Sequence, residues 1–370
     1  MKYYNIKKIL TDYPDAHYYV VIGERSNGKT YSALSYALER YFTTGEQFAY
    51  VRRWGEDIRR KNLSQLFAAH IENGLITKLS KGQWDDIVYV GSKFRLTKSV
   101  DENGKLKTET SEDCVGYAFD LNSMEHYKSI SFPRITTVIF DEFLSRNGYL
   151  PNEFILFTNT LSTIIRQRNN VKIIMLGNTV NKSCPYFGEM GLTHVKDQEQ
   201  GTIDVYHYGK SRLQVVVEYA ESTSKHGGKE SDVYFAFDNP ELQMITQGSW
   251  EIAVYPHKPC SFTPKDIMFI FFIEFENELI QGEVVALDVG TFIFFHRKTG
   301  EIKHPDGDLV YTTRASERWN YKMCLTRQTD KVSKKILDYF KANKVFYADN
   351  EVGEIIRNYL MWSDRYDIRN

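Results

Sequence analysis

Apolar and polar positions alternate along the first 180 residues in a rhythm typical of an α/β domain. The apolar run at 17–22 (HYYVVI) predicts a buried strand, and the helical spacing after it predicts a helix over 29–42. Such apolar strands are expected in a parallel sheet that is covered on both faces. The same pattern predicts further strands at 48–52, 136–143 and 172–178, a charged amphipathic helix at 55–71, and a helix at about 151–167 that Pro151 and Asn152 open.

Two stretches depart from this rhythm. Residues 76–120 hold short alternating segments joined by the polar DENGKLKTETSED, which predicts a β-hairpin insertion that decorates the sheet. Residues 201–265 are polar and mixed, which predicts a linker region, and a second α/β pattern begins near 268 with MFIFFIEF. We therefore expect a first domain over 1–200, a linker region over 201–265 and a smaller α/β domain over 266–370.

Composition narrows the class of protein. The 370 residues are 42% hydrophobic, enough for more than one core, and the formal charge of -1 restricts any nucleic-acid contact to local patches. The four cysteines lie far apart, which argues against a zinc cluster or a disulfide scaffold and favours a reducing cytosol. The longest apolar run, 267–273, is much shorter than the ~20 residues of a membrane span, and the first residues lack an apolar signal segment. We expect no membrane association and no secretion.

The loop between the first predicted strand and helix matches the phosphate-binding motif GxxxxGK[ST] at Gly23, Gly28, Lys29 and Thr30. In this motif the glycines let backbone N–H groups face a phosphate, the lysine reaches the outer phosphates, and the hydroxyl holds magnesium. Arg25, inside the loop, either faces phosphate or is solvated. The position between a strand and a helix favours nucleotide binding over a turn that only resembles the motif.

Polar residues end two further apolar strands. Asp141 and Glu142 close TTVIFDEF, where the first carboxylate can hold magnesium and the second can polarise an attacking water. A kinase has no use for a water-activating glutamate, so this pair favours an ATPase; a solvent-facing acidic pair is the alternative. Asn178 ends KIIMLGN and is either a phosphate sensor or part of a Gly-Asn turn.

Four arginines lie next to these strands. Arg52 and Arg53 end the second predicted strand, and Arg166 and Arg168 follow the helix before the Asn178 strand. Each either contacts phosphate or DNA or is a solvated surface residue.

Six segments together resemble the DNA-packaging motor ATPases of phi-29-like bacteriophages, over most of the chain. Two of the segments, GEQFAYVRR and YLPNEF, carry no general nucleotide chemistry and so indicate this family rather than P-loop proteins at large. The segments are GERSNGKTY, GEQFAYVRRW, TTVIFDEF, YLPNEF, IIRQRNNVKIIMLGN and FYADNEVGEIIRNYL.

The resemblance implies an ATPase domain of the additional-strand, catalytic-glutamate class that uses ATP and Mg²⁺. It implies a homo-oligomeric ring, pentameric in the family, that docks transiently at the portal of a procapsid in the host cytoplasm and drives double-stranded DNA inward. A structural RNA at the dock is left open. By position, Lys29 and Thr30 match the phosphate and magnesium residues, and Arg166 matches a trans-acting arginine finger. Asp141, Glu142 and Asn178 match the magnesium carboxylate, the catalytic glutamate and the coupling residue.

The resemblance further implies a C-terminal domain with an RNase H-like fold whose nuclease is vestigial and which serves docking. Its first three strands would be MFIFFIEF, VVALDV and FIFFHR, with Asp288 in a stretch that predicts a hairpin turn. The acids available there are Glu274, Asp288, Asp349 and Glu351. The alternatives are a large terminase with an active nuclease, a non-motor P-loop nucleotide kinase, and an adaptor with an inactive P-loop.

Overall fold

The computed structural model describes residues 3–102, 105–122, 127, 129–146, 148–150, 152–180, 182, 184–221, 253–288 and 290–365. These residues form two compact units. The first contains the described residues of Met1–Leu144, Glu153–Val180 and His194–Trp250, and the second those of Ser145–Asn152, Asn181–Thr193 and Glu251–Asn370.

Nine described strands of the first unit form one sheet, in the order β3-β4-β5-β2-β6-β7-β1-β9-β8. The six central strands, β5-β2-β6-β7-β1-β9, pair in parallel. The outer strands β3, β4 and β8 pair antiparallel with their neighbours. Their bounds are β1 Tyr18–Gly23, β2 Gln47–Arg52, β3 Asp86–Val90, β4 Lys93–Glu102, β5 Lys105–Asp120, β6 Ile135–Asp141, β7 Lys172–Asn178, β8 Ile203–His207 and β9 Gln214–Tyr219.

The two long helices of the first unit cover opposite faces of this sheet. α2 (Lys29–Thr44) packs on the face that contains Ile139 of β6. The next residue along the strand, Phe140, points to the other face, where its ring stacks on Phe157 of α6 (Glu153–Ile165) at a centroid distance of 4.9 Å. A short helix, α1 (Ile6–Asp12), precedes β1.

The strands predicted near 17–22, 48–52, 136–143 and 172–178, and the helices that follow the first and third of them, are confirmed. Pro151, expected to open the second of these helices, lies outside the described residues. The single amphipathic helix predicted at 55–71 is wrong. Two short helices replace it and a third follows, because Phe67 turns into the core between Phe48 and Phe94. These helices are α3 (Arg60–Leu63), α4 (Ala68–Glu72) and α5 (Leu75–Leu79).

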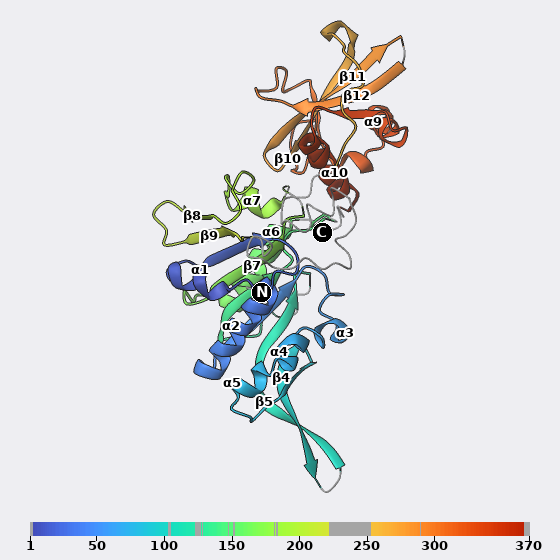
Figure 1. Ribbon diagram of the computed structural model, residues 1–370. Helices are drawn as coiled ribbons and strands as arrows, with labels where there is room; N and C mark the ends of the chain where they lie inside the picture. The colour runs from blue at the N-terminus through green and yellow to red at the C-terminus, as the bar shows by residue number, and fades with distance from the viewer. Residues whose placement is uncertain are drawn as a thin grey trace. The chain divides into compact units, whose positions relative to one another are not determined.

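The β-hairpin expected in 76–120 is present, but it is more than a decoration. In Figure 1 the β4–β5 hairpin extends beyond the rest of its sheet, yet the last part of β5 pairs in parallel with β2 inside the sheet. The linker expected from 201 also differs from the structure, because β8 and β9 extend the same sheet beyond β1. Edge strands with few fully buried residues, such as β8, give a weak hydrophobic pattern.

The described strands of the second unit form a six-stranded sheet in the order β14-β13-β10-β11-β12-β15. β10 (Ile267–Phe275), β11 (Glu278–Leu287) and β12 (Gly290–Arg297) form an antiparallel meander, which confirms the three strands predicted there. The other strands are β13 (Leu309–Thr312), β14 (Tyr321–Met323) and β15 (Val345–Tyr347), and the helices are α7 (Pro185–Glu189), α9 (Lys331–Lys341) and α10 (Asn350–Arg365), with short 3-10 turns at Pro264–Asp266 and Leu325–Arg327.

No helix among the described residues combines the length and apolar character needed to cross a bilayer.

Candidate nucleotide-binding site

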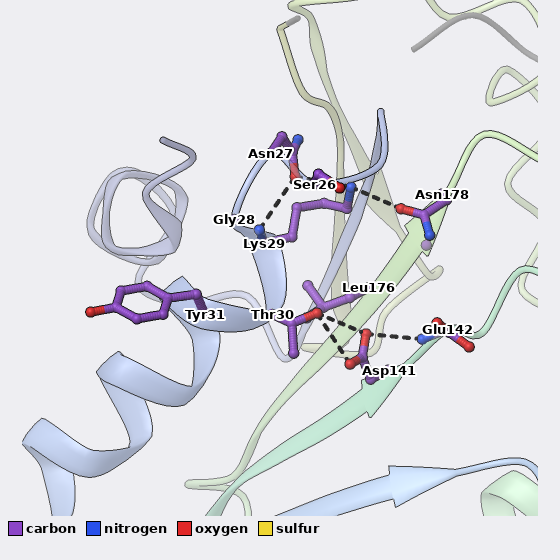
Figure 2. A pocket seen from close by; sticks show the side chains of 11 residues that line it. Ser26, Asn27, Gly28, Lys29, Thr30, Tyr31, Asp141, Glu142, Leu176 and Asn178 are labelled. Carbon is purple, nitrogen blue, oxygen red and sulfur yellow. Dashed lines mark hydrogen bonds between the residues drawn. The ribbon is translucent and has the colours of Figure 1, made fainter. Parts of the chain in front are cut away.

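The predicted phosphate-binding loop connects β1 to α2. β1 ends at Gly23, and Gly28 caps α2 with a left-handed φ of 89°, a conformation that favours glycine. A Cβ at Gly28 would also lie 3.2 Å from the Cβ of Tyr3. The loop and the ends of β6 and β7 enclose a pocket of about 270 Å³ (Figure 2), lined by Ser26, Asn27, Gly28, Lys29, Thr30, Tyr31, Asp141, Glu142, Leu176, Gly177 and Asn178.

Lys29 is buried at the base of the loop. Its ammonium donates to the carbonyl oxygen of Glu24 at 2.6 Å, to Asn27 Oδ1 at 3.1 Å and to Asn178 Oδ1 at 3.3 Å. Burial lowers the pKa of Lys29 to about 8, although Asp141 and Glu24 raise it. A buried ammonium held by three neutral oxygens gains from an anion in the pocket.

Asn27 is a pocket residue that the motif did not single out, because its position in GxxxxGK[ST] is free. Its side chain is 2% exposed, and its Oδ1 accepts from the Lys29 ammonium. The Nδ2 of the same side chain is buried without a hydrogen-bond partner. An orphaned donor on a pocket wall matches a phosphate oxygen.

Asp141 lies at the end of β6 opposite the loop. Figure 2 shows the Thr30 hydroxyl facing the Asp141 carboxylate, and the hydroxyl lies 3.1 Å from Oδ2. The Tyr50 hydroxyl donates to the same Oδ2 at 2.9 Å from β2. Burial raises the pKa of Asp141, while Arg52, Tyr50 and Thr30 lower it. A hydroxyl and a carboxylate in contact are ligands that Mg²⁺ prefers.

Glu142 follows in a left-handed conformation, with φ of 57°. Its Oε2 accepts from Arg52 Nη2 at 2.6 Å, and the same nitrogen donates to Asp57 at 3.2 Å. Burial lowers the pKa of Arg52, but Tyr50, Glu142 and Asp141 raise it above its ordinary value overall. The sequence left Arg52 open between a phosphate contact and a solvated surface position. In the structure it pairs with Glu142 and Asp57.

The other loop residues are placed as follows. Asn178 ends β7, as the sequence predicted, and lines the pocket. Gly23 ends β1, and its carbonyl oxygen accepts from the Thr179 N–H at 3.3 Å. Arg25 is exposed and is not among the residues that line the pocket. Its phosphate-facing interpretation therefore gains no support from the geometry.

Arg166 lies at the other end of the parallel strands, far from the pocket. It follows α6 and precedes β7, so it is near the beginning of strands whose ends form the pocket. The length of β7, seven residues, separates the two ends by roughly 20 Å. Arg166 is exposed, and its Nη2 donates to the Ile130 carbonyl at 3.1 Å. Arg166 therefore cannot reach a phosphate bound in this chain's own pocket.

Arg168 is engaged differently. Its guanidinium donates to five backbone carbonyl groups, two at the end of α6 and three before or within the start of β6. This geometry makes Arg168 a structural cap of α6.

The four acids singled out in the second unit do not converge. Asp288 lies in the turn between β11 and β12, as predicted, and Glu274 lies on β10. Asp349 and Glu351 instead flank Arg297, whose Nη2 lies 2.8 Å from Glu351 and whose Nη1 lies 3.8 Å from Asp349. In the part of the chain that the structure describes, no group of three His, Cys, Asp or Glu side chains could hold a metal ion.

The pocket of the first unit suits the phosphate groups of a nucleotide and a divalent cation. The orphaned Asn27 donor and the buried Lys29 ammonium suit phosphate oxygens, and the Thr30–Asp141 pair suits the cation. All of these groups come from one compact unit.

Comparisons of sequence agree with this geometry. The model of the podovirus DNA encapsidation protein (Gp16) family matches residues 1–77 and 99–238, more than half of the chain. The DNA packaging proteins of Bacillus phages PZA and phi29 are each 30% identical over 193 residues, which cover 50% of this chain and 49% of theirs. The match thus spans about half the length of these relatives.

Solved structures extend the likeness of fold. The Phi-28 gp11 DNA packaging motor aligns with a TM-score of 0.55 at 18% identity, over 100% of this chain and 99% of that chain. The bacteriophage Phi-29 viral genome packaging motor assembly aligns with a TM-score of 0.56 at 20% identity, over 98% and 99%. At these identities the likeness establishes the fold.

Proposed function

Since this chain belongs to the podovirus DNA encapsidation protein (Gp16) family, we propose that it is the ATPase of a packaging motor that drives double-stranded DNA into a viral procapsid. The observation that carries the proposal is one pocket lined by Lys29, Thr30, Asp141 and Glu142, the residue types that ATP hydrolysis uses. The relatives are named as DNA packaging proteins, which supports the coupling to DNA.

Binding uses the loop. Lys29 exchanges its neutral oxygen partners for the outer phosphates, and Asn27 Nδ2 gains the acceptor that it lacks. Thr30 and Asp141 would hold Mg²⁺, which when bound neutralises charge on the transferring phosphoryl group. Tyr50 keeps the Asp141 carboxylate oriented from behind.

Hydrolysis uses Glu142 as the general base. Its carboxylate takes a proton from the attacking water, whose oxygen bonds to the γ-phosphorus while the bond to the bridging oxygen breaks and ADP leaves. In the structure this carboxylate accepts from Arg52, so turnover requires Glu142 to exchange that partner for water. This role would place the protein in the catalytic-glutamate class.

The test compares two substitutions in the full chain. Lys29→Ala should weaken ATP binding by at least about tenfold, because a charge facing the phosphates is lost, whereas Glu142→Gln should bind ATP normally and lose turnover by about 10²-fold or more. Equilibrium binding and steady-state phosphate release measure the two effects. Turnover by Glu142→Gln at the wild-type rate would refute the mechanism.

The assembly follows from the same proposal. A homo-oligomeric ring, pentameric as in the family resemblance, would dock at the procapsid portal in the host cytoplasm, with or without a structural RNA. Arg166, too far from its own pocket to act there, would serve as the arginine finger of the neighbouring site.

For the second unit we infer an RNase H-like fold that serves docking rather than cutting. The antiparallel meander β10–β12, with β13 parallel to β10, supports this fold. Arg297 supports the loss of nuclease chemistry, since its guanidinium occupies the space between Asp349, Glu351 and Glu278.

We therefore expect the full chain to leave supercoiled plasmid intact in the presence of Mn²⁺, measured by gel mobility. Cleavage that Asp349→Ala abolishes would contradict this expectation and would favour a nuclease-active terminase.

A further inference from the structure

We propose that Arg53 is a positioning residue for ATP hydrolysis, which fixes the backbone of the turn that carries Glu142. The inference rests on the proposed function, because it assigns a role relative to the catalytic glutamate. Arg53 directly follows β2, and the sequence left it open between a phosphate contact and a solvated surface.

Arg53 is buried among hydrogen-bond acceptors. Its side chain is 5% exposed, and that of Glu153 is 0% exposed. Arg53 Nε and Nη2 donate to the two carboxylate oxygens of Glu153 at 2.7 and 2.8 Å. The guanidinium also donates to the backbone carbonyl oxygens of Glu142 at 3.2 Å and Phe143 at 2.6 Å. One side chain thus joins the end of β2, the turn after β6 and the first residue of α6.

The turn needs such support because of its backbone conformation. Glu142 has φ of 57°, which L-residues with side chains rarely adopt without surrounding constraints. The Glu142 N–H donates to Asp141 Oδ1 at 3.1 Å, and the Phe143 N–H donates to the Leu176 carbonyl at 3.1 Å. Arg53 holds the two carbonyl groups of the same turn. Together these bonds set the direction in which the Glu142 side chain leaves the backbone.

Arg53 and Arg52 act on Glu142 from different sides. Consecutive residues at the end of a strand point in opposite directions. Arg52 meets the carboxylate of Glu142, and Arg53 meets its carbonyl group. The contact between Arg52 and the Glu142 carboxylate has to change during turnover. The contact between Arg53 and the Glu142 carbonyl group has to persist. A planar guanidinium can bind a carboxylate and two carbonyl groups at once, which an ammonium cannot do in the same geometry.

The experiment separates positioning from stability. In the double variant Arg53→Met/Glu153→Leu an apolar pair replaces the buried ion pair, a change that is often neutral for stability. Because the carbonyl groups of Glu142 and Phe143 lose the guanidinium donor, we expect the variant to unfold below the wild-type temperature. At a temperature where it is folded, it should bind ATP within about threefold of wild type, while kcat falls by about tenfold to a hundredfold, as for a small misplacement of a catalytic group. Arg53→Lys keeps the buried charge but lacks the planar fork of N–H donors. It should likewise lower kcat while leaving KM for ATP nearly unchanged. If the apolar pair unfolds below the assay temperature, Arg53→Lys alone decides.

A control removes an ion pair elsewhere in the first unit that is more exposed than the Arg53–Glu153 pair. Arg40 donates to Glu46 through Nη2 at 2.7 Å and Nε at 2.9 Å, away from the turn, and Arg40→Met/Glu46→Leu should keep the wild-type kcat. A kcat within twofold of wild type for Arg53→Lys, or for a folded Arg53→Met/Glu153→Leu, overturns the inference. If Glu142→Gln hydrolyses ATP as fast as wild type, the proposed function fails instead.

Discussion

Asp141 is oriented by two hydroxyl groups that come from different elements. Thr30 approaches from the start of α2, and Tyr50 approaches from β2. Thr30 would also bind the metal, whereas Tyr50 contacts only the carboxylate. A partner such as Tyr50, which orients a metal-binding carboxylate without binding the metal, tunes metal affinity by about 10- to 100-fold. Tyr50 therefore belongs to the chemistry of the site although it does not line the pocket.

We predict that Tyr50→Phe raises the Mg²⁺ concentration for half-maximal ATPase activity by about tenfold, because Asp141 loses a hydrogen bond that orients it. Titration of Mg²⁺ at saturating ATP measures the effect. Tyr41→Phe is the matched control, since the Tyr41 hydroxyl lies 3.3 Å from Asp113 outside the pocket. Equal Mg²⁺ dependence in both variants would show that Tyr50 only fills space.

Sequence alone could indicate the residues that belong to motifs. Gly28, Lys29 and Thr30 follow a spacing, and Asp141 and Asn178 were found because parallel strands end at one edge of a sheet. Tyr50, Arg52 and Asn27 were not assigned to the site, because their contacts depend on strand register and loop shape. The sequence did contain an indication that Tyr50 and Arg52 belong together. They lie two residues apart on a strand and so point to the same face.

At the scale of elements, long apolar strands were predicted well and edge strands poorly. β1, β6 and β7 are buried along almost their whole length, so their hydrophobic runs are unambiguous. β8 has no fully buried residue and joins the sheet only through pairing with β9, which a local pattern cannot report. The broken helix at 55–71 failed for a similar reason, since tertiary packing of Phe67 outweighed its helical spacing.

The β11–β12 pair contains a charge interaction that depends on pH. His296 Nε2 lies 3.2 Å from Glu283 Oε1, and this contact raises the pKa of His296 against the effect of its burial. The pKa of Glu283 is lowered by His296 although burial raises it. The histidine's contribution to stability is complete below its unfolded pKa of about 6.5 and is lost as pH rises through the higher folded pKa. The glutamate's contribution is lost as pH falls through its lowered pKa.

We predict that His296→Asn lowers the unfolding temperature of the full chain more at pH 6 than at pH 8.5. The reason is that the ion pair with Glu283 exists only while the ring is protonated. Thermal unfolding followed by circular dichroism at the two pH values measures this, with the exposed His304→Asn as control. A loss that is the same at both pH values would mean that His296 contributes packing and no charge.

At the scale of the whole molecule, the two ends of the parallel strands of the first sheet carry different residues. The pocket lies where β6 and β7 end, and Arg166 lies where β7 begins. Under the proposed function, no arginine of the described residues lines the pocket, and the candidate finger Arg166 lies too far away to act in its own subunit. The activity of a subunit should therefore depend on its neighbours.

We predict slow hydrolysis by isolated subunits and faster hydrolysis on assembly with procapsid and DNA, with the stimulation lost in Arg166→Ala. In mixed rings Arg166→Ala subunits, which keep their pocket, should regain turnover beside Lys29→Ala subunits, which keep the finger; a finger is worth ~10³–10⁵ in rate. Phosphate release across a series of mixing ratios is the measurement.

The control mixes Lys29→Ala with Glu142→Gln subunits. Both defects lie in the same pocket, so no interface in such a ring has a complete site, and no activity should return. If Arg166→Ala and Lys29→Ala also fail to complement at every ratio while both assemble, Arg166 does not act in trans.

The direction of α6 bears on the order in which neighbouring subunits would act. Its 13 residues span roughly 20 Å from Glu153, held with the Glu142 turn by Arg53, to the residue before Arg166. A stiff helix carries a displacement at its first turn to its last. If Arg166 acts on the next subunit, as proposed, product formation in one pocket would reach the finger offered to one neighbour and not to the other. Events around such a ring would then follow one rotational sense.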